Sequence, residues 1–193
     1  RELLPYLDLA YQGYGGGIEQ DAFAVRALAS AGLSFMIANS FSKSMSVYGE
    51  RAGALSVVCA DAAEAELVLG QMKATVRRIY SSPAIHAAGI ISRVLGDPAL
   101  RTTWEADVAA MRERILSMRR SLHGVLSAKL PGRDLGYFLT QRGMFSYTGL
   151  SAAQVDRLRD DYAVYLVRSG RICLAGLNTG NVERTAEAIA AML

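Results

Sequence analysis

A single helical stripe dominates the second half of the sequence. Between Pro98 and Leu130, large apolar residues recur at every third or fourth position, and most charged residues lie between them. The stripe consists of Leu100, Trp104, Val108, Met111, Ile115, Met118, Leu122 and Val125. This period indicates an amphipathic α-helix with one apolar face, which Pro131 and Gly132 would end. Such a helix is roughly 45 Å long at about 1.5 Å per residue, so it can bridge two domains.

Three short runs before Pro98 are almost continuously apolar, which is typical of strands buried on both faces. They lie at residues 4–12, 33–40 and 52–60. Helical patterns follow the first run, as far as Gly32, and the third run, where Asp61 is a suitable N-cap. The order strand, helix, strand, strand, helix predicts an α/β sheet that is covered on both faces.

The last third of the chain predicts a smaller α+β layer. A short strand is expected near 143–150, followed by a helix with Ser151 as its N-cap. Two further strands, 162–167 and 171–177, are expected to form a pair. A terminal helix would begin at Asn181.

Composition and charge exclude several classes of function. The net charge is +3 and no block of Lys and Arg forms a basic patch, so no nucleic-acid partner is expected. No apolar run reaches the length of a membrane span, so no membrane is expected as a partner. The two histidines and two cysteines have no metal-ligand spacing. Cys59 and Cys173 lie in apolar surroundings, which predicts buried free thiols in a reducing, cytoplasmic compartment.

A lysine lies in a serine-rich bend directly after the second apolar run. The segment reads NSFSKSMSVYGERAG, and Lys43 is one of its two cations. Partial burial and a nearby cation would both favour the neutral amine, which is the nucleophilic form. The other cation, Arg51, suits an anion such as phosphate, and Ser40 and Ser42 offer hydroxyl donors to the same anion. The alternative is a solvated loop, which this segment alone does not exclude.

Two residues near the start of the chain could serve the same site. Asp8 stands among apolar residues of the first expected strand, where a carboxylate is costly unless it is paired. It would form either a buried salt bridge with a nearby arginine or a partner for a protonated ring nitrogen. Tyr11 would be either a core tyrosine or a hydrogen-bond donor to a phenolic oxygen. An amine nucleophile, a phosphate clamp and a carboxylate for a ring nitrogen are together what pyridoxal phosphate requires.

Five segments, in order along the chain, resemble the aspartate/aromatic aminotransferase family, which has fold type I of the pyridoxal-phosphate enzymes. They are DLAYQGYGGGIEQDAFAVR, NSFSKSMSVYGERAG, RRIYSSPAIHAA, QRGMFSYTGL and SGRICLAGLN. The resemblance covers essentially the whole chain, as the C-terminal half of such an enzyme, so that the rest of the family's site would lie upstream of Arg1. The segment RGMFSYTGLSAAQVDRLR is most similar to the bacterial tyrosine (aromatic amino acid) aminotransferases.

The resemblance implies a role for each residue around the bend. Lys43 would be the Schiff-base lysine, and also the base that moves a proton between the substrate α-carbon and the cofactor. Asp8 would keep the pyridine ring of the cofactor protonated, and Tyr11 would donate to its 3′-oxygen. The phosphate ligands would be Ser40, Ser42 and Arg51.

The resemblance also implies three substrate contacts. Arg171 would bind the substrate α-carboxylate, although an arginine at a strand edge commonly pairs with a surface acid instead. In a homodimer, Arg77 would reach into the site of the neighbouring subunit and bind the side-chain carboxylate of a dicarboxylic substrate. Arg78 adjoins Arg77, so a shift of one residue would exchange them. Phe145 would line the substrate pocket.

The fold that the resemblance implies is α/β with two domains. Residues 1–97 would be the C-terminal part of the large cofactor-binding domain, with a mixed, mostly parallel sheet. Residues 98–130 would form the long bridging helix, and residues 131–193 a small C-terminal α+β domain.

The reaction that the resemblance implies is a ping-pong transfer of an amino group. The donor would be an aromatic or dicarboxylic L-amino acid, and the acceptor a 2-oxo acid such as 2-oxoglutarate. One alternative is an aspartate aminotransferase, and another is the aminotransferase-like effector domain of a transcription regulator. A different fold-type-I reaction, such as decarboxylation or β-elimination, is a third. The presence of both Arg77 and Arg171 favours transamination, because two carboxylate clamps fit a dicarboxylic substrate.

Overall fold

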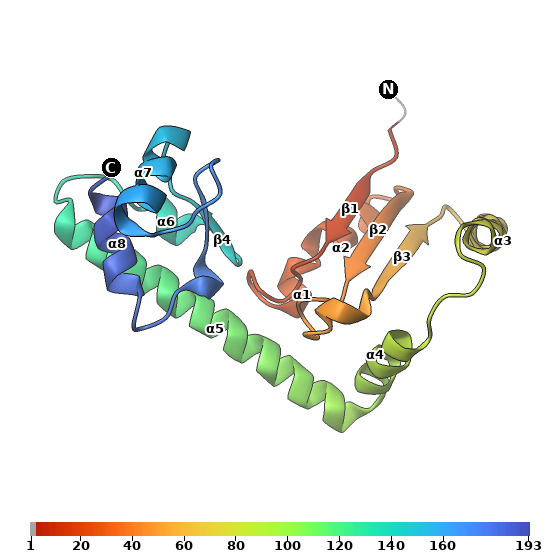
Figure 1. Ribbon diagram of the computed structural model, residues 1–193. Helices are drawn as coiled ribbons and strands as arrows, with labels where there is room; N and C mark the ends of the chain where they lie inside the picture. The colour runs from red at the N-terminus through yellow and green to blue at the C-terminus, as the bar shows by residue number, and fades with distance from the viewer. Residues whose placement is uncertain (1–2) are drawn as a thin grey trace. The chain divides into compact units, whose positions relative to one another are not determined.

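The computed structural model describes residues 3–193 (Figure 1). Internal packing divides the chain into two compact units. The first unit contains the residues up to 13 and residues 17–108, and the second contains residues 14–16 and 109–193. Within the described residues, no helix is both long and apolar enough to cross a membrane.

The first unit contains a three-stranded sheet of order β1-β2-β3. Its strands are β1 (Tyr6–Leu9), β2 (Phe35–Ser40) and β3 (Gly53–Val58). β1 runs parallel to β2 with Asp8 opposite Ala38, and β3 runs antiparallel to β2 with Gly53 opposite Ser40. The predicted mixed sheet is therefore present. In residues 3–193, however, one of its two pairings is antiparallel, so this sheet is not mostly parallel.

Helices of the first unit are short, apart from one. They are α1 (Ile18–Asp21), α2 (Phe23–Ser30), the 3-10 turn η1 (Tyr48–Glu50), α3 (Ala62–Ile79) and α4 (His86–Gly96). The predicted N-cap of α3 is confirmed, because the Asp61 carboxylate accepts a hydrogen bond from the Glu64 amide at 2.8 Å. The sequence patterns do not indicate α4, although it buries Ala87 and Ile91, which lie four residues apart on one face.

The sheet of the first unit is only partly covered. Phe35 and Ile37 of β2 are buried, whereas Tyr6 of β1 is 60% exposed and Leu55 of β3 is 48% exposed. The prediction of a sheet covered on both faces is therefore wrong for residues 3–193. The continuous apolar runs are nevertheless typical of a sheet with two covered faces, and the described residues supply only part of that cover.

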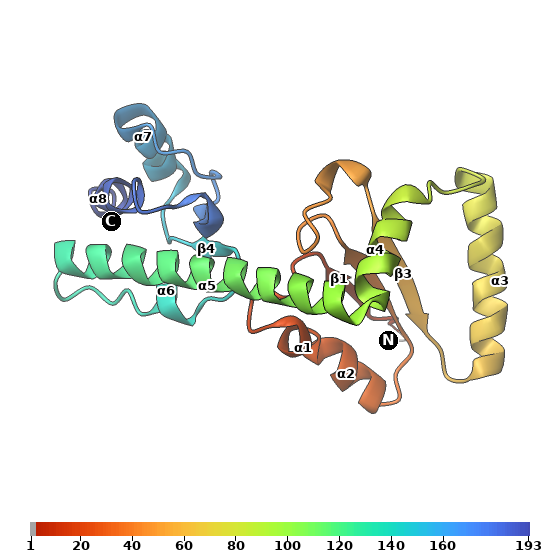
Figure 2. The ribbon, with the colours of Figure 1, turned by 90° about the horizontal axis from the view of Figure 1, so that it is seen from below.

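One helix, α5 (Pro98–Lys129), runs for 32 residues without interruption (Figures 1 and 2). It confirms the long helix that the apolar stripe predicts. The division between the two units falls inside it, after Val108. Within the second unit the middle of the stripe is buried, since Ile115, Met118 and Leu122 are at most 7% exposed. α5 therefore supplies one wall of the second core.

The second unit combines the later turns of α5 and three further helices with a two-stranded antiparallel sheet. Its elements after α5 are α6 (Tyr137–Thr140), β4 (Phe145–Tyr147), α7 (Ala152–Tyr162), β5 (Arg171–Cys173), the 3-10 turn η2 (Leu174–Gly176) and α8 (Val182–Ala190). The predicted helix start at Ser151 is confirmed as a capping box with Gln154. Phe138, Leu158 and Ile189 are fully buried in this core.

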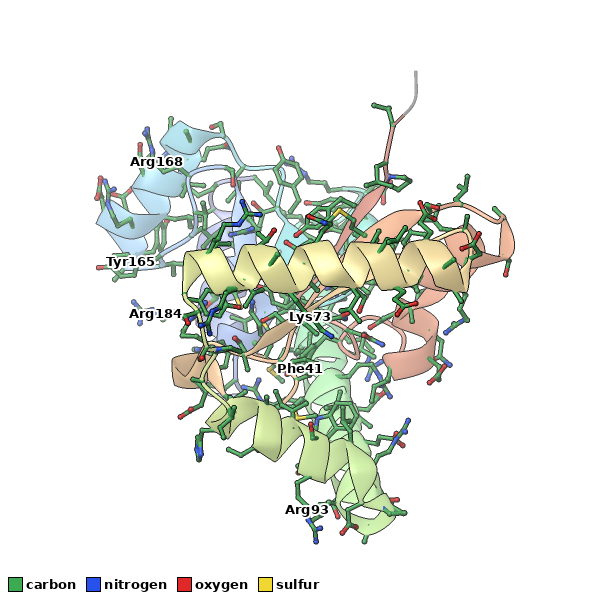
Figure 3. The ribbon with its side chains drawn as sticks, turned by 90° about the vertical axis from the view of Figure 1, so that its right-hand side faces the viewer. Phe41, Lys73, Arg93, Tyr165, Arg168 and Arg184 are labelled. Atoms are coloured by element: carbon green, nitrogen blue, oxygen red, sulfur yellow. The ribbon has the colours of Figure 1, made fainter. Side chains whose placement is uncertain are left out.

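Residues 162–167 do not form the strand that their alternation predicts. α7 continues to Tyr162 and ends at Ala163, whose φ of 52° lies in the left-handed region. Val167 forms one isolated bridge only, and β5 pairs with β4 instead. The guanidinium of Arg184, labelled in Figure 3, donates to the carbonyl oxygen of Tyr162 at 2.7 Å. This side-chain contact takes up a backbone acceptor that a strand would give to its neighbour.

Both cysteines are free thiols, but neither is buried. Cys59 is half-buried and Cys173 is exposed. The prediction of buried thiols is therefore wrong. In β5 the reason is the alternation of a strand: Ile172 faces the core, so Cys173 faces away from it.

Replacement of Ser151 by alanine should lower the free energy of unfolding by about 1 kcal/mol, because the capping box of α7 is lost. The Ser151 hydroxyl accepts from the Gln154 amide at 3.4 Å, and the Gln154 side chain accepts from the Ser151 amide at 2.8 Å. Urea unfolding measures the change. Ser127→Ala is the control, since Ser127 is exposed inside α5 and caps no helix; equal losses in both variants would contradict the capping role.

Candidate functional site

The carboxyl ends of β1 and β2 bring polar side chains to one edge of the sheet. The two strands are parallel, so both end at the same edge, and in α/β sheets ligands commonly bind outside such an edge. Asp8 lies one residue before the end of β1, and Ser40 is the last residue of β2. Asp8 is exposed, and its carboxylate forms no ion pair or hydrogen bond with another of residues 3–193. The alternative of a buried salt bridge at Asp8 is therefore wrong for this part of the chain.

The bend that carries Lys43 begins directly after β2, at Phe41, which Figure 3 labels. Its first turn is closed by the hydrogen bond from the Met45 amide to the Phe41 carbonyl oxygen at 3.1 Å. The Ser42 amide donates to the Ser40 hydroxyl oxygen at 3.3 Å, and Ser42 is only 5% exposed. Lys43 is therefore held on a compact turn and not on a solvated loop.

Lys43 is half-buried, and its amine lies beside an aromatic ring. The Nζ atom is 4.5 Å from the centroid of the Tyr11 ring. A protonated amine at this distance is attracted by the negative face of the ring. Tyr11 is 38% exposed, so it is not the core tyrosine that the sequence left open. The structure thus brings Lys43 together with Tyr11, two residues after the end of β1.

Arg51 returns to the same edge of the sheet because the bend is closed at its far end. The Phe41 amide donates to the carbonyl oxygen of Ala52 at 3.2 Å, next to the pairing of Ser40 with Gly53. Glycine is required there, since a Cβ atom on Gly53 would lie 2.7 Å from the carbonyl oxygen of Asn39.

Two residues of the bend have left-handed backbone without being glycine. They are Ser46, with φ of 54°, and Arg51, with φ of 55°. Such a conformation costs roughly 1–2 kcal/mol for a residue with a side chain, and it is characteristic of functional sites. The Arg51 guanidinium is exposed and donates one hydrogen bond, to the carbonyl oxygen of Tyr48 at 3.0 Å.

One contact to the bend comes from a residue that sequence reasoning placed only in the apolar stripe. The indole Nε1 of Trp104 donates to the carbonyl oxygen of Ser44 at 2.7 Å, next to Lys43. A partly buried tryptophan usually needs an acceptor for its N–H group, which is the one signal that the sequence offered. The acceptor is a backbone carbonyl group 60 residues earlier in the chain, and no sequence pattern identifies it.

Arg171 and Phe145 lie together in the second unit. They belong to the paired strands β5 and β4, where Tyr147 is opposite Arg171 and Cys173 is opposite Phe145. The guanidinium carbon of Arg171 is 4.6 Å from the centroid of the Phe145 ring. Arg171 is exposed and forms no ion pair within residues 3–193, so the alternative of a surface acid as its partner does not hold there.

Arg77 lies in the last turn of α3 and is exposed. Within residues 3–193, no hydrogen bond, ion pair or ring contact joins it to the Lys43 bend. Its neighbour Arg78 differs, because the Nε atom of Arg78 donates to the carbonyl oxygen of Ala74 at 3.4 Å. Within residues 3–193, Arg77 is therefore the one of the two whose guanidinium group forms no hydrogen bond.

Residues 1–189 match the family Aminotransferase class I and II. An aromatic-amino-acid aminotransferase of Escherichia coli K12 is 61% identical over 193 residues, which are 100% of this chain and 49% of that protein. An aspartate aminotransferase of Pseudomonas aeruginosa is 49% identical over 190 residues, or 98% of this chain and 48% of that protein.

A solved structure is similar over the same extent. An aromatic-amino-acid aminotransferase from Burkholderia pseudomallei, covalently bound to pyridoxal phosphate, has a TM-score of 0.96 and 50% identity, covering 100% of this chain and 48% of that one. The chain thus spans about half the length of the relatives that it matches. Because the family match extends over nearly every residue, the chain belongs to the aminotransferase class I and II family.

Proposed function

We propose that the whole protein is an aminotransferase that uses pyridoxal phosphate and transfers an amino group between an aromatic or dicarboxylic L-amino acid and a 2-oxo acid. One observation carries the proposal. The half-buried amine of Lys43 lies 4.5 Å from the Tyr11 ring, on a closed turn at the sheet edge that also holds Asp8. Membership of the family supports the same reaction.

The side chains at this edge fit pyridoxal phosphate in their chemistry. The exposed Asp8 carboxylate suits a protonated ring nitrogen, and the Tyr11 phenol suits the ring oxygen. The Lys43 amine suits covalent attachment of the aldehyde carbon. Hydroxyl and guanidinium donors for the phosphate are Ser40, Ser42 and Arg51. When bound, pyridoxal phosphate supplies an electron sink for the negative charge that develops at the substrate α-carbon.

Lys43 would serve both as the attachment point and as the proton carrier. With the cofactor bound, the neutral Nζ atom would be the base that takes up the proton leaving the substrate α-carbon. The adjacent Tyr11 ring then stabilises the protonated amine. The Trp104 indole holds the carbonyl group of the next residue, Ser44, so the backbone from which the Lys43 side chain extends is fixed.

Arg171 and Arg77 would bind the carboxylates of the substrates. A guanidinium group is planar and binds a carboxylate through two parallel hydrogen bonds. Both groups are exposed and lack an ion pair within residues 3–193, so the described chain leaves both able to bind. Phe145 lies against the Arg171 guanidinium and would add an apolar wall for an aromatic substrate. Arg77 would act across a homodimer, in the site of the other subunit.

We favour an aromatic substrate over a dicarboxylic one. The support is the identity of 61% with an aromatic-amino-acid aminotransferase, against 49% with the aspartate aminotransferase of Pseudomonas aeruginosa. An aspartate aminotransferase is the second candidate, since relatives of that name match over almost the same length.

We also propose the domain division and a location. Residues 1–97 would belong to the large cofactor-binding domain, 98–130 to a bridging helix, and 131–193 to a small α+β domain. The presence of two free thiols, Cys59 and Cys173, favours the cytoplasm, where thiols stay reduced.

Reduction of the whole protein with borohydride in the presence of pyridoxal phosphate should attach the cofactor to the peptide that contains Lys43. Lys43→Ala should abolish this label and lower kcat by at least about 10²–10⁴-fold, the usual contribution of a positioned base. Peptide mass mapping checks the position. Lys73→Ala, on the exposed surface of α3, is the control and should keep the label. A label on another lysine in the unaltered protein would overturn the proposal.

Arg51→Ala and Arg51→Gly should separate backbone strain from phosphate binding. Without cofactor, the glycine variant should be more stable to urea than the alanine variant by about 1 kcal/mol, because only glycine adopts a φ of 55° without strain. Both should bind pyridoxal phosphate about 10- to 100-fold more weakly, since each loses charge-assisted hydrogen bonds. An absorbance titration measures this loss, and unchanged affinity would show that Arg51 is not a phosphate ligand.

Arg77→Ala should raise KM for aspartate by about 10- to 100-fold, because a charged hydrogen-bonding partner of the side-chain carboxylate is removed. KM for tyrosine, which has no second carboxylate, should change little. Steady-state kinetics with both amino acids make the comparison, and Arg78→Ala is the matched control. Equal losses for the two substrates would mean that Arg77 has a structural role.

A further inference from the structure

Arg119 of α5 is a buried cation that the proposed reaction does not use. It is only 2% exposed, and no carboxylate pairs with it within residues 3–193. Burial lowers the pKa of Arg119, and its Nε atom has no hydrogen-bond partner among the described residues. Burying such a charge is costly unless its hydrogen bonds are satisfied. The hydrogen bonds of its two Nη atoms must therefore offset this cost.

The guanidinium group of Arg119 holds one segment of the chain, residues 138–146, through three backbone carbonyl groups and one hydroxyl group. Nη1 donates to the carbonyl oxygen of Phe138 at 2.8 Å and to the hydroxyl oxygen of Ser146. Nη2 donates to the carbonyl oxygens of Gly143 at 2.8 Å and Phe145 at 3.2 Å. All four acceptors lie in the stretch that leads into β4 and through its first two residues. Since the fork is planar and rigid, it fixes the peptide group that follows Gly143 and the one that follows Phe145.

Phe145 in turn contacts the Arg171 guanidinium. The two groups lie 4.6 Å apart, from guanidinium carbon to ring centroid, on the same face of the β4–β5 pair. Arg171 forms no hydrogen bond or ion pair through its side chain within residues 3–193. The ring is therefore the surface that limits where this guanidinium can point.

A second arginine of α5 holds the segment that directly follows the strand of Arg171. Nη1 of Arg114 donates to the carbonyl oxygen of Ala175 at 3.2 Å, and Nη2 donates to that of Leu177 at 2.7 Å. Both acceptors lie after β5. The same helix thus holds β4 through Arg119 and the segment after β5 through Arg114.

We propose that Arg119 is a positioning residue for the carboxylate site. Its fork fixes β4, β4 fixes the Phe145 ring, and the ring orients the Arg171 guanidinium. The inference rests on the proposed function, because the carboxylate-binding role of Arg171 belongs to that proposal. If Arg119 served only the stability of the core, its effect on carboxylate binding would not depend on the Phe145 ring.

The test measures the Kd of 3-phenylpropionate, a carboxylate that cannot react, on the whole protein loaded with pyridoxal phosphate. Arg119→Lys keeps the charge and loses the fork, so Kd should rise about tenfold, as expected for a misplaced binding group. Arg120→Lys is the matched control, since Arg120 is the exposed neighbour in α5 and should leave Kd unchanged. If the cofactor-loaded fraction of Arg119→Lys binds 3-phenylpropionate with an unchanged Kd, the inference is overturned.

A double-mutant cycle shows whether the effect passes through the ring. Phe145→Leu should itself weaken binding, and Arg119→Lys should then add no further rise in Kd. Additive losses would overturn the inference. If Arg119→Lys does not fold, Ser146→Ala removes one acceptor of the fork and should still raise Kd by about threefold, half the tenfold change on a logarithmic scale. No change in Ser146→Ala would then overturn the inference instead.

Failure of this inference is distinguishable from failure of the proposed function. Arg171→Lys replaces the bidentate group by a point charge and should weaken 3-phenylpropionate binding more than any other variant. If Arg171→Lys leaves Kd unchanged, the proposed carboxylate clamp is wrong, and the positioning role falls with it. If Arg171→Lys weakens binding and Arg119→Lys does not, only the positioning role is wrong.

Discussion

The parallel pairing of β1 with β2 is the constraint on which the candidate site depends. It sets Asp8 opposite Ala38, so that both strands end at the edge where the Lys43 bend begins. The antiparallel return of β3 then brings Arg51 to the same edge. A slip of one residue in either pairing would turn Asp8 or Ser40 to the opposite face of the sheet. The register therefore selects which side chains can meet a common ligand.

Local signals in the sequence were sufficient for much of the secondary structure. The caps at Asp61 and Ser151 each require a residue only three positions away, and the stripe of α5 is a local period. The strand expected at 162–167 failed for the opposite reason. Its alternation is equally local, but a strand needs a partner, and β5 pairs with β4. The partly covered sheet shows the same limit of a local pattern, since the residues of a strand do not reveal which element packs against it.

The site was less accessible to sequence reasoning than the fold. Spacing alone did not place the Lys43 amine beside Tyr11, and the resemblance to a known family was needed to connect them. Arg119 and Arg120 are identical neighbours in the sequence, yet one is buried and the other exposed. The fork of Arg119 binds three backbone carbonyl groups. Every residue type has such a group, so the sequence does not reveal which residues are the partners.

The continuity of α5 has a thermodynamic consequence for the chain. Its first turns carry Trp104, which holds the bend of the first unit, and its later turns carry Arg114 and Arg119, which hold the sheet of the second. Between them the helix contains neither glycine nor proline, so its hydrogen-bond ladder has no weak point at the division between the units. Melting of either unit would fray the helix that the other requires. The two units should therefore lose their structure cooperatively, as one folding unit with two cores.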